Sequence, residues 1–281
     1  MKGARAARGL AARARSTAAR LSPRALHDRS NYRRIQRRLA GPRLVAAFAD
    51  AYPDAFFIEI GSNDGDQHDF LRPGILAKRW RGLMVEPVPY VFERLRANYG
   101  GLERVTLENA AIADHDGNIP FYHLREAAPD EGLPGWYHGV GSFSREAVLG
   151  HRGFIPDVEE RLVEASVPCL TFESLCGKHS IEQLDLLLID VEGYDAEIVR
   201  TIDLTRRHPR LLVYEHYHLS EADRQECVRI VEAAGYETLA EGFDTWCLDP
   251  EAAPELAELW RGLSPAVAPA TAAQDRARPV A

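Results

Sequence analysis

The 281-residue sequence contains no apolar run that approaches the roughly 20 residues of a membrane span. Its N-terminus lacks the apolar core of about 7–15 residues that a secretory signal requires. The four cysteines form no CxxC pair, which argues against a structural zinc site and is typical of reduced thiols: Cys169, Cys176, Cys227 and Cys247. We therefore expect a cytoplasmic protein without a transmembrane segment.

Acidic residues are scarce at the N-terminus. Residues 1–43 contain 13 Lys or Arg and a single acid, Asp28, so this segment carries +12 although the whole chain carries −8. The remaining residues carry −20, and an acidic body does not fit a nucleic-acid enzyme with a basic catalytic face. We expect a flexible or helical basic arm that is available to an anionic surface. Its Arg-rich, acid-poor composition also resembles a mitochondrial transit peptide.

The remaining length is sufficient for one large domain. Hydrophobic residues make up 46% of the chain and charged residues 27%, as in ordinary globular proteins. We expect one α/β domain over 44–263 and a disordered, Ala/Pro-rich tail over 264–281. Self-association into a homo-oligomer is left open.

Strand and helix patterns alternate along this domain. This alternation predicts a doubly wound, mostly parallel sheet, and such sheets bind ligands at the carboxyl ends of their strands. The expected strands are 56–60, 83–86, 105–109, 119–124, 167–170, 184–190, 211–214, 236–240 and 243–248. The candidate site residues that follow strand ends are Gly61, Glu86, Asn109, Asp190 and Glu215.

The first expected strand ends in a glycine-containing turn at residues 61–65. Gly61 and Gly65 can adopt positive φ and leave space for a ligand. The turn lacks the middle glycine of the G-x-G-x-x-G dinucleotide fingerprint, so it would crowd a pyrophosphate. Glu86 ends the second strand, where a carboxylate can accept both hydroxyls of a ribose. The pair predicts a nucleoside cofactor and looks like an S-adenosylmethionine site.

Residues 125–160 interrupt the alternation with many glycines, prolines and aromatic residues. Long irregular stretches inside a compact domain are usually functional. We expect a substrate or lid loop, and a disordered insertion is the alternative.

Two groups of polar residues follow strands in the second half. In an extended chain Asp190 and Glu192 would lie on one face, while His216 and His218 would face away from Glu215. His216 is our candidate general base, or else a histidine that only hydrogen-bonds its loop. Asp190, Glu192 and Glu215 are candidate ligands for Mg²⁺. The other histidines without a partner pattern are expected at the surface: His27, His115, His151 and His208.

Five motifs together resemble the FkbM family of S-adenosylmethionine-dependent methyltransferases. They are FFIEIGSNDGD at 56–66, VEPVPYVFERL at 85–95, NAAIAD at 109–114, LTFESL at 170–175 and DLLLIDVEGYD at 185–195. The resemblance implies a Rossmann-like methyltransferase fold with seven strands, the last of them antiparallel. It also implies that Glu59, Gly61, Asn63 and Gly65 line the methionine end of the cofactor and that Glu86 binds its ribose. Asn109 to Ala111, including Ala110, would border the adenine, with Asp190 and Glu192 at the reacting centre.

The function that follows from the resemblance is O-methylation of a small molecule such as a sugar, a glycoside or a polyketide-type product. A nitrogen or nucleic-acid acceptor is the first alternative, although the Asn/Asp-Pro-Pro-aromatic turn used for exocyclic amines is missing. A non-catalytic cofactor-binding module docked by the basic arm is the second.

Overall fold

The computed structural model describes residues 40–66 and 69–263. The expectations for residues 1–39 of the arm and for the tail over 264–281 lie outside the described residues.

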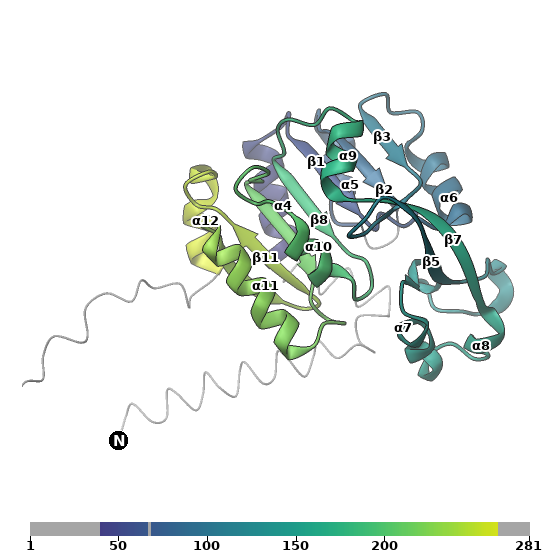
Figure 1. Cartoon of the computed structure of the whole chain (residues 1–281). Coiled ribbons are helices and arrows are strands. Elements are labelled where there is room, and N and C mark those ends of the chain that lie inside the picture. The colour runs from purple at the N-terminus through teal and green to yellow at the C-terminus, as the bar shows by residue number, and fades with distance from the viewer. Residues whose placement is uncertain (1–39, 67–68, 264–281) are drawn as a thin grey trace, which may run out of the picture.

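A seven-stranded sheet forms the centre of the molecule (Figure 1). All neighbouring strands are parallel except β11, which runs antiparallel to both β9 and β10. This arrangement confirms the predicted doubly wound fold with an antiparallel last strand. The order across the sheet is β10 (Glu237–Glu241), β11 (Asp244–Leu248), β9 (Leu211–Glu215), β8 (Leu186–Ile189), β1 (Phe56–Ile60), β2 (Arg81–Val85) and β3 (Val105–Glu108).

Helices cover both faces of this sheet, because its buried strands are apolar on both sides. Phe57 points into one hydrophobic cluster and its neighbour Ile58 into the other. The cluster containing Phe57 is covered by α4 (Ala40–Ala51), α5 (Arg72–Ala77), α6 (Pro89–Tyr99) and α12 (Ala257–Leu263), the last preceded by η4 (Pro254–Leu256). The cluster containing Ile58 is covered by α9 (Phe172–Lys178), α10 (Asp195–Thr201) and α11 (Glu221–Ala233).

The first helix begins earlier than the sequence patterns predict. Residues 40–43 belong to α4, although we expected them in the basic arm. Gly41 packs so closely on the Trp246 ring that a Cβ there would lie 2.1 Å from it, and its N–H donates to Glu241 Oε2 at 3.1 Å. These contacts make residues 40–43 part of the folded domain.

A second, four-stranded sheet lies beside the first one (Figure 1). Its long strands pair antiparallel over eight residues, and they contain the strands expected at 119–124 and 167–170. The order is β4 (Ala111–Ile112), β7 (Leu162–Leu170), β5 (Gly117–Leu124) and β6 (Gly141–Ser142).

The segment over 125–160 is more ordered than its sequence pattern indicates. It has its own buried cluster, in which Tyr137, Val148 and Ile155 pack against Leu124 of β5. Besides β6 it contains η1 (Pro129–Glu131), η2 (Tyr137–Gly139), α7 (Arg145–Leu149), η3 (Gly150–Gly153) and α8 (Val158–Arg161). The segment is therefore a small folded unit inserted between β5 and β7.

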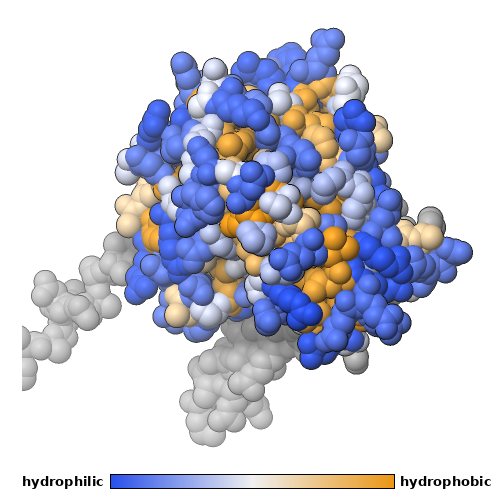
Figure 2. Space-filling model, turned by 45° about the vertical axis from the view of Figure 1, so that its right-hand side comes forward, coloured by the Kyte–Doolittle hydropathy of each residue, from blue (hydrophilic) through white to orange (hydrophobic). Residues whose placement is uncertain are grey.

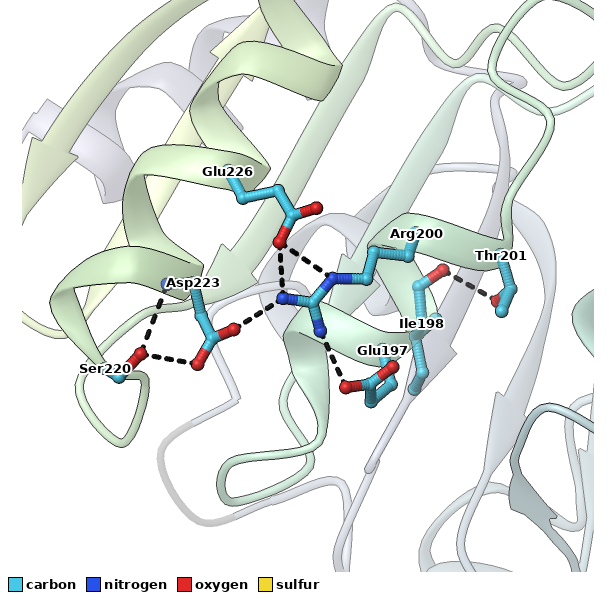
Figure 3. A network of polar contacts seen from close by, with 7 residues as sticks. All are labelled: Glu197, Ile198, Arg200, Thr201, Ser220, Asp223 and Glu226. Atoms are coloured by element: carbon cyan, nitrogen blue, oxygen red, sulfur yellow. Dashed lines mark hydrogen bonds and ion pairs between the residues drawn. The ribbon is translucent and has the colours of Figure 1, made fainter.

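Helices α10 and α11 are joined by one arginine (Figure 3). Arg200 donates to Glu226 Oε2 from Nε at 3.1 Å and from Nη2 at 2.6 Å, and it also contacts Glu197 and Asp223. Ser220 caps α11 by accepting the N–H of Asp223. This network fixes the two helices next to the turns that follow β8 and β9.

Hydrophilic residues cover most of the face shown in Figure 2, with apolar areas exposed between them. None of the helices in the described part of the chain has the length and apolar character that a membrane crossing requires.

Candidate active site

A cavity of about 780 Å³ opens at the carboxyl ends of the parallel strands. Its walls are the turns after β1, β2, β8 and β9, the β10–β11 turn and part of the segment between β5 and β7. Small-molecule sites typically measure roughly 300–1,000 Å³, and doubly wound sheets bind ligands at this edge. Gly61, Glu86, Asp190 and Glu215, which the sequence placed at strand ends, all line it.

The turn after β1 requires glycine at residue 61. Gly61 has φ +85°, and a Cβ there would lie 1.7 Å from the carbonyl oxygen of Asp190. The N–H groups of Gly61 and Ser62 both donate to the carbonyl oxygen of Val85 at 3.0 Å. The turn therefore lies tightly between the ends of β2 and β8, and Asn63 faces the cavity at φ +48°.

Gly65 serves a different purpose from Gly61. It lies outside the cavity lining, and a Cβ there would meet the Tyr99 ring at 2.4 Å. The Tyr99 hydroxyl donates to the carbonyl oxygen of Gly65 at 2.8 Å. Packing against α6 explains this glycine without any contact to a ligand.

Glu86 is fixed at the end of β2 by two backbone hydrogen bonds. Its Oε1 accepts the N–H of Val88 at 2.8 Å, and its Oε2 accepts the N–H of Asn63 at 3.1 Å. An ionised carboxylate has about four acceptor positions, so it can still accept two hydroxyls. Burial raises the pKa of Glu86 to about 7.

Asn109 contacts the backbone of Glu86 from outside the cavity lining. Its Nδ2 donates to the carbonyl oxygens of Glu86 at 2.8 Å and Pro87 at 3.2 Å, and the residue itself is outside the lining. Ala110 lines the cavity directly, together with Ala111 and Ile112.

The lining is acidic. It contains nine Asp or Glu residues and two histidines but, among the described residues, no Lys or Arg. Glu59 is the least exposed of these acids at 3%, and its Oε2 has no hydrogen-bond partner in the described part of the chain. Burial, with nearby Asp69 and Asp190, holds the pKa of Glu59 well above the ordinary value. Such a cavity favours a cationic ligand.

Asp190 and Glu192, which follow β8, both line the cavity. The chain is not extended there, because Glu192 has the left-handed φ of +53°. Asp190 is exposed to the cavity, and desolvation by the surrounding walls, with the charge of Glu192 second, raises its pKa to about 7. The carbonyl oxygen of Glu192 accepts the Ser142 hydroxyl at 3.4 Å, which links this turn to β6.

The turn after β9 brings His218 to these carboxylates. His218 Nε2 is 2.9 Å from Glu192 Oε2 and 3.9 Å from Glu215 Oε1. Burial alone would lower the pKa of His218, but the hydrogen bond and charge of Glu192, with Asp190, raise it above the ordinary value. Burial and the neighbouring acids, Asp190 first, hold the pKa of Glu215 well above its usual range.

His216 does not lie beside His218, because the chain turns after Glu215. The His216 ring is hydrogen-bonded to Thr245 Oγ1 at 3.0 Å, outside the cavity lining. Burial and the charge of Arg224 lower its pKa. We expected both histidines on one side because we treated residues 215–218 as extended. The chain turns after Glu215 instead, so this expectation is wrong.

His151 is the other functional candidate that the sequence analysis missed. We expected it at the surface, but it is partly buried in the cavity wall, and its ring centroid is 5.9 Å from that of His218. It comes from η3, some forty residues before Asp190 along the chain, so no local sequence pattern connects the two.

Comparison with known proteins identifies the family. Residues 59–238 match the model described as the methyltransferase FkbM domain. The chain belongs to the FkbM methyltransferase family. This confirms the resemblance of the five motifs, which all lie in or at the edge of the matched range.

Individual relatives of this FkbM-family chain are more distant. The 2-O-methyltransferase NoeI of Sinorhizobium fredii (strain NBRC 101917 / NGR234) is 28% identical over 157 residues, covering 52% of this chain and 57% of NoeI. The chain thus spans little more than half the length of this curated relative.

Two solved methyltransferase structures each cover 69% of the chain. A methyltransferase FkbM from Methylobacillus flagellatus KT is 12% identical with a TM-score of 0.42, over 43% of that protein. The precorrin-6y C5,15-methyltransferase of Geobacter metallireducens GS-15 is 13% identical with a TM-score of 0.34, over 79% of that protein.

Proposed function

We propose that this protein transfers a methyl group from S-adenosylmethionine to a hydroxyl group of a small molecule. The observation that carries the proposal is the Gly61–Asn63 turn together with Glu86, at the edge of a carboxylate-lined cavity in a chain of this family. S-adenosylmethionine supplies an electrophilic methyl group on a sulfonium cation. The acidic lining complements the positive charge of this cofactor.

On the cofactor side, Glu86 would accept the ribose hydroxyls. The turn at Gly61 and Asn63 would border the methionine end, where the unpartnered, buried Glu59 can accept an ammonium group. Ala110 would contact the adenine. Gly65 and Asn109 are left out of the contact set, because the first packs on α6 and the second positions Glu86.

On the acceptor side, the Glu192–His218 pair is placed to remove the hydroxyl proton. Glu192 orients the His218 ring at 2.9 Å and favours its protonated form. A positioned base accelerates a reaction by roughly 10²–10⁴-fold. His216 has no access to the cavity, so we prefer His218 as the base, with Asp190 facing the same space.

The acceptor would lie between these groups and the 125–160 segment, which we propose as the substrate loop. Phe143 of this segment and Tyr194 pack with ring centroids 4.4 Å apart, and Phe154 and Tyr217 are exposed at the cavity. Aromatic and acidic surfaces together suit an uncharged or cationic organic molecule better than a polyanion. A nucleic-acid acceptor is therefore disfavoured. Cytoplasmic location belongs to the same proposal.

The test is methyl transfer from S-adenosylmethionine with a labelled methyl group to a panel of sugars, glycosides and hydroxylated polyketides. The expected product is a methyl ether, identified by mass and by NMR of the isolated compound. His218→Gln should lower turnover by about 10²–10⁴-fold while cofactor affinity stays near the wild-type value. His115→Gln, an exposed histidine outside the cavity, is the matched control. Label found only on nitrogen would overturn the hydroxyl acceptor. A loss of turnover in His216→Gln but not in His218→Gln would overturn His218 as the base.

A further inference from the structure

Three potential metal ligands converge on one wall of the cavity: His151, Glu192 and His218. One ligand atom from each lies within 4.8 Å of those of the other two. The Glu192–His218 distance is already 2.9 Å. Ligand atoms in a tetrahedral zinc site are about 3.3 Å apart, so the side chains need to close by at most about 1.5 Å.

Two of the three ligands, His151 and Glu192, are held by their own surroundings. His151 Nδ1 is 3.2 Å from the carbonyl oxygen of Val148, to which it can donate, and this leaves Nε2 with a free lone pair. The Trp136 ring packs on the His151 ring with centroids 5.4 Å apart. Glu192 is held in the left-handed region at φ +53°, a conformation that costs free energy and is concentrated at functional sites.

A fourth group supports a cation at this place. Glu215 is 8% exposed, and its Oε2 has no hydrogen-bond partner among the described residues. Its other oxygen is 3.9 Å from His218 Nε2. A buried carboxylate without a partner is costly, and a nearby divalent cation would compensate for it.

We propose that His151, Glu192 and His218 form a binding site for a divalent transition metal. Two imidazole nitrogens and one carboxylate are the ligand set of catalytic zinc sites and of Fe(II) sites with open positions. Mg²⁺ requires oxygen ligands in octahedral geometry. Of the magnesium ligands expected from the sequence, Asp190, Glu192 and Glu215, only Glu192 belongs to this set.

Because all three ligands line the cavity, water or an oxygen of the acceptor would complete the coordination of the metal. The role toward the acceptor rests on the proposed function, whereas metal binding itself does not. A metal bound at His218 Nε2 would replace the role as base that we propose for this histidine in the metal-free protein. The hydroxyl proton would then pass to Asp190, which lines the same cavity.

Metal binding is tested on the full chain, first by elemental analysis of the purified protein. The chelator-treated protein is then titrated with Co²⁺ and with Zn²⁺, by visible absorption and by calorimetry. We expect one site per chain, and His151→Ala and His218→Ala should each weaken binding by about 100-fold or more, since loss of a group that merely supports a ligand costs about 10–100-fold. His115→Ala, at an exposed position, should bind like wild type. Circular dichroism of each variant shows that the fold is retained.

Three results would overturn the site: absence of stoichiometric binding, equal affinity in His151→Ala and wild type, or equally tight binding of Mg²⁺. S-adenosylmethionine binding is measured on the same samples. Cofactor binding without metal binding defeats only the metal site, and metal binding without cofactor binding defeats only the proposed function.

Discussion

Replacing Gly61 with alanine tests how tightly the ends of β1, β2 and β8 are packed beneath the cavity. The backbone has φ +85° there, which costs an L-residue about 1–2 kcal/mol. The new Cβ would lie 1.7 Å from the carbonyl oxygen of Asp190, which is backbone and cannot rotate away. Separating the strand ends adds about 1–3 kcal/mol, the usual cost of overpacking, so the total loss is about 2–5 kcal/mol.

The matched control is Gly132→Ala. Gly132 also has a left-handed φ, +67°, but an added Cβ there meets nothing within 4 Å. This variant should lose only the conformational cost of about 1–2 kcal/mol. Urea unfolding at constant pH, with m-values compared, measures both losses. Equal losses in the two variants would refute the close approach of residue 61 to Asp190.

Cofactor affinity should rise between about pH 6 and pH 8, because Glu86, with a pKa of about 7, must be ionised to accept both ribose hydroxyls. Without cofactor, the folding stability of the protein depends on pH with the opposite sign. The raised pKa of Glu86 contributes stability that is present below the unfolded pKa and is lost as the pH rises through 7. Calorimetry in buffers of different ionisation enthalpy should detect proton release, and a flat pH profile would contradict this. Arg200→Met should lower the unfolding free energy by about 1–2 kcal/mol, since three carboxylates lose their partner, and the difference should shrink at high salt. An unchanged midpoint at low salt would show that the network contributes nothing.

The main sheet was predictable because its strands are short, apolar runs followed by turn residues. Phe56–Ile60 and Leu186–Ile189 are buried on both faces, so their patterns are continuous. The same logic placed Gly61, Glu86 and Asp190 at one edge. The carboxyl ends of parallel strands lie at this edge of the sheet irrespective of the conformations of the loops.

The second sheet was harder to predict, for a physical reason. In Leu162–Leu170 most residues remain at least partly accessible, and Pro168 is untypical of a strand although it lies within β7, so only the last residues show a strand pattern in the sequence. The partner of this strand is Gly117–Leu124, and the residues between them fold around a cluster of their own. Pairing between strands that are this far apart in the sequence leaves no periodic pattern in the residues of either strand.

The histidines show which side-chain positions could not be predicted from the sequence. Whether His216 or His218 faces the cavity depends on the turn after Glu215, and an extended backbone was the wrong assumption there. His151 lies beside His218 only through the tertiary packing of η3. The positions of the strand ends could therefore be predicted from the sequence, whereas the side-chain directions within the turns could not.

The most direct measurement is calorimetric titration of S-adenosylmethionine into the wild-type chain, Glu86→Gln and Glu108→Gln. Glu108 ends the neighbouring strand β3, and its carboxylate binds Lys178 and His179 outside the cavity lining, so it is a matched control. We expect one cofactor per chain, a loss of about 1.5–3 kcal/mol or roughly 10–150-fold for Glu86→Gln, and no change in affinity for Glu108→Gln. No binding to the wild-type chain, or equal affinity of all three proteins, would contradict the cofactor site.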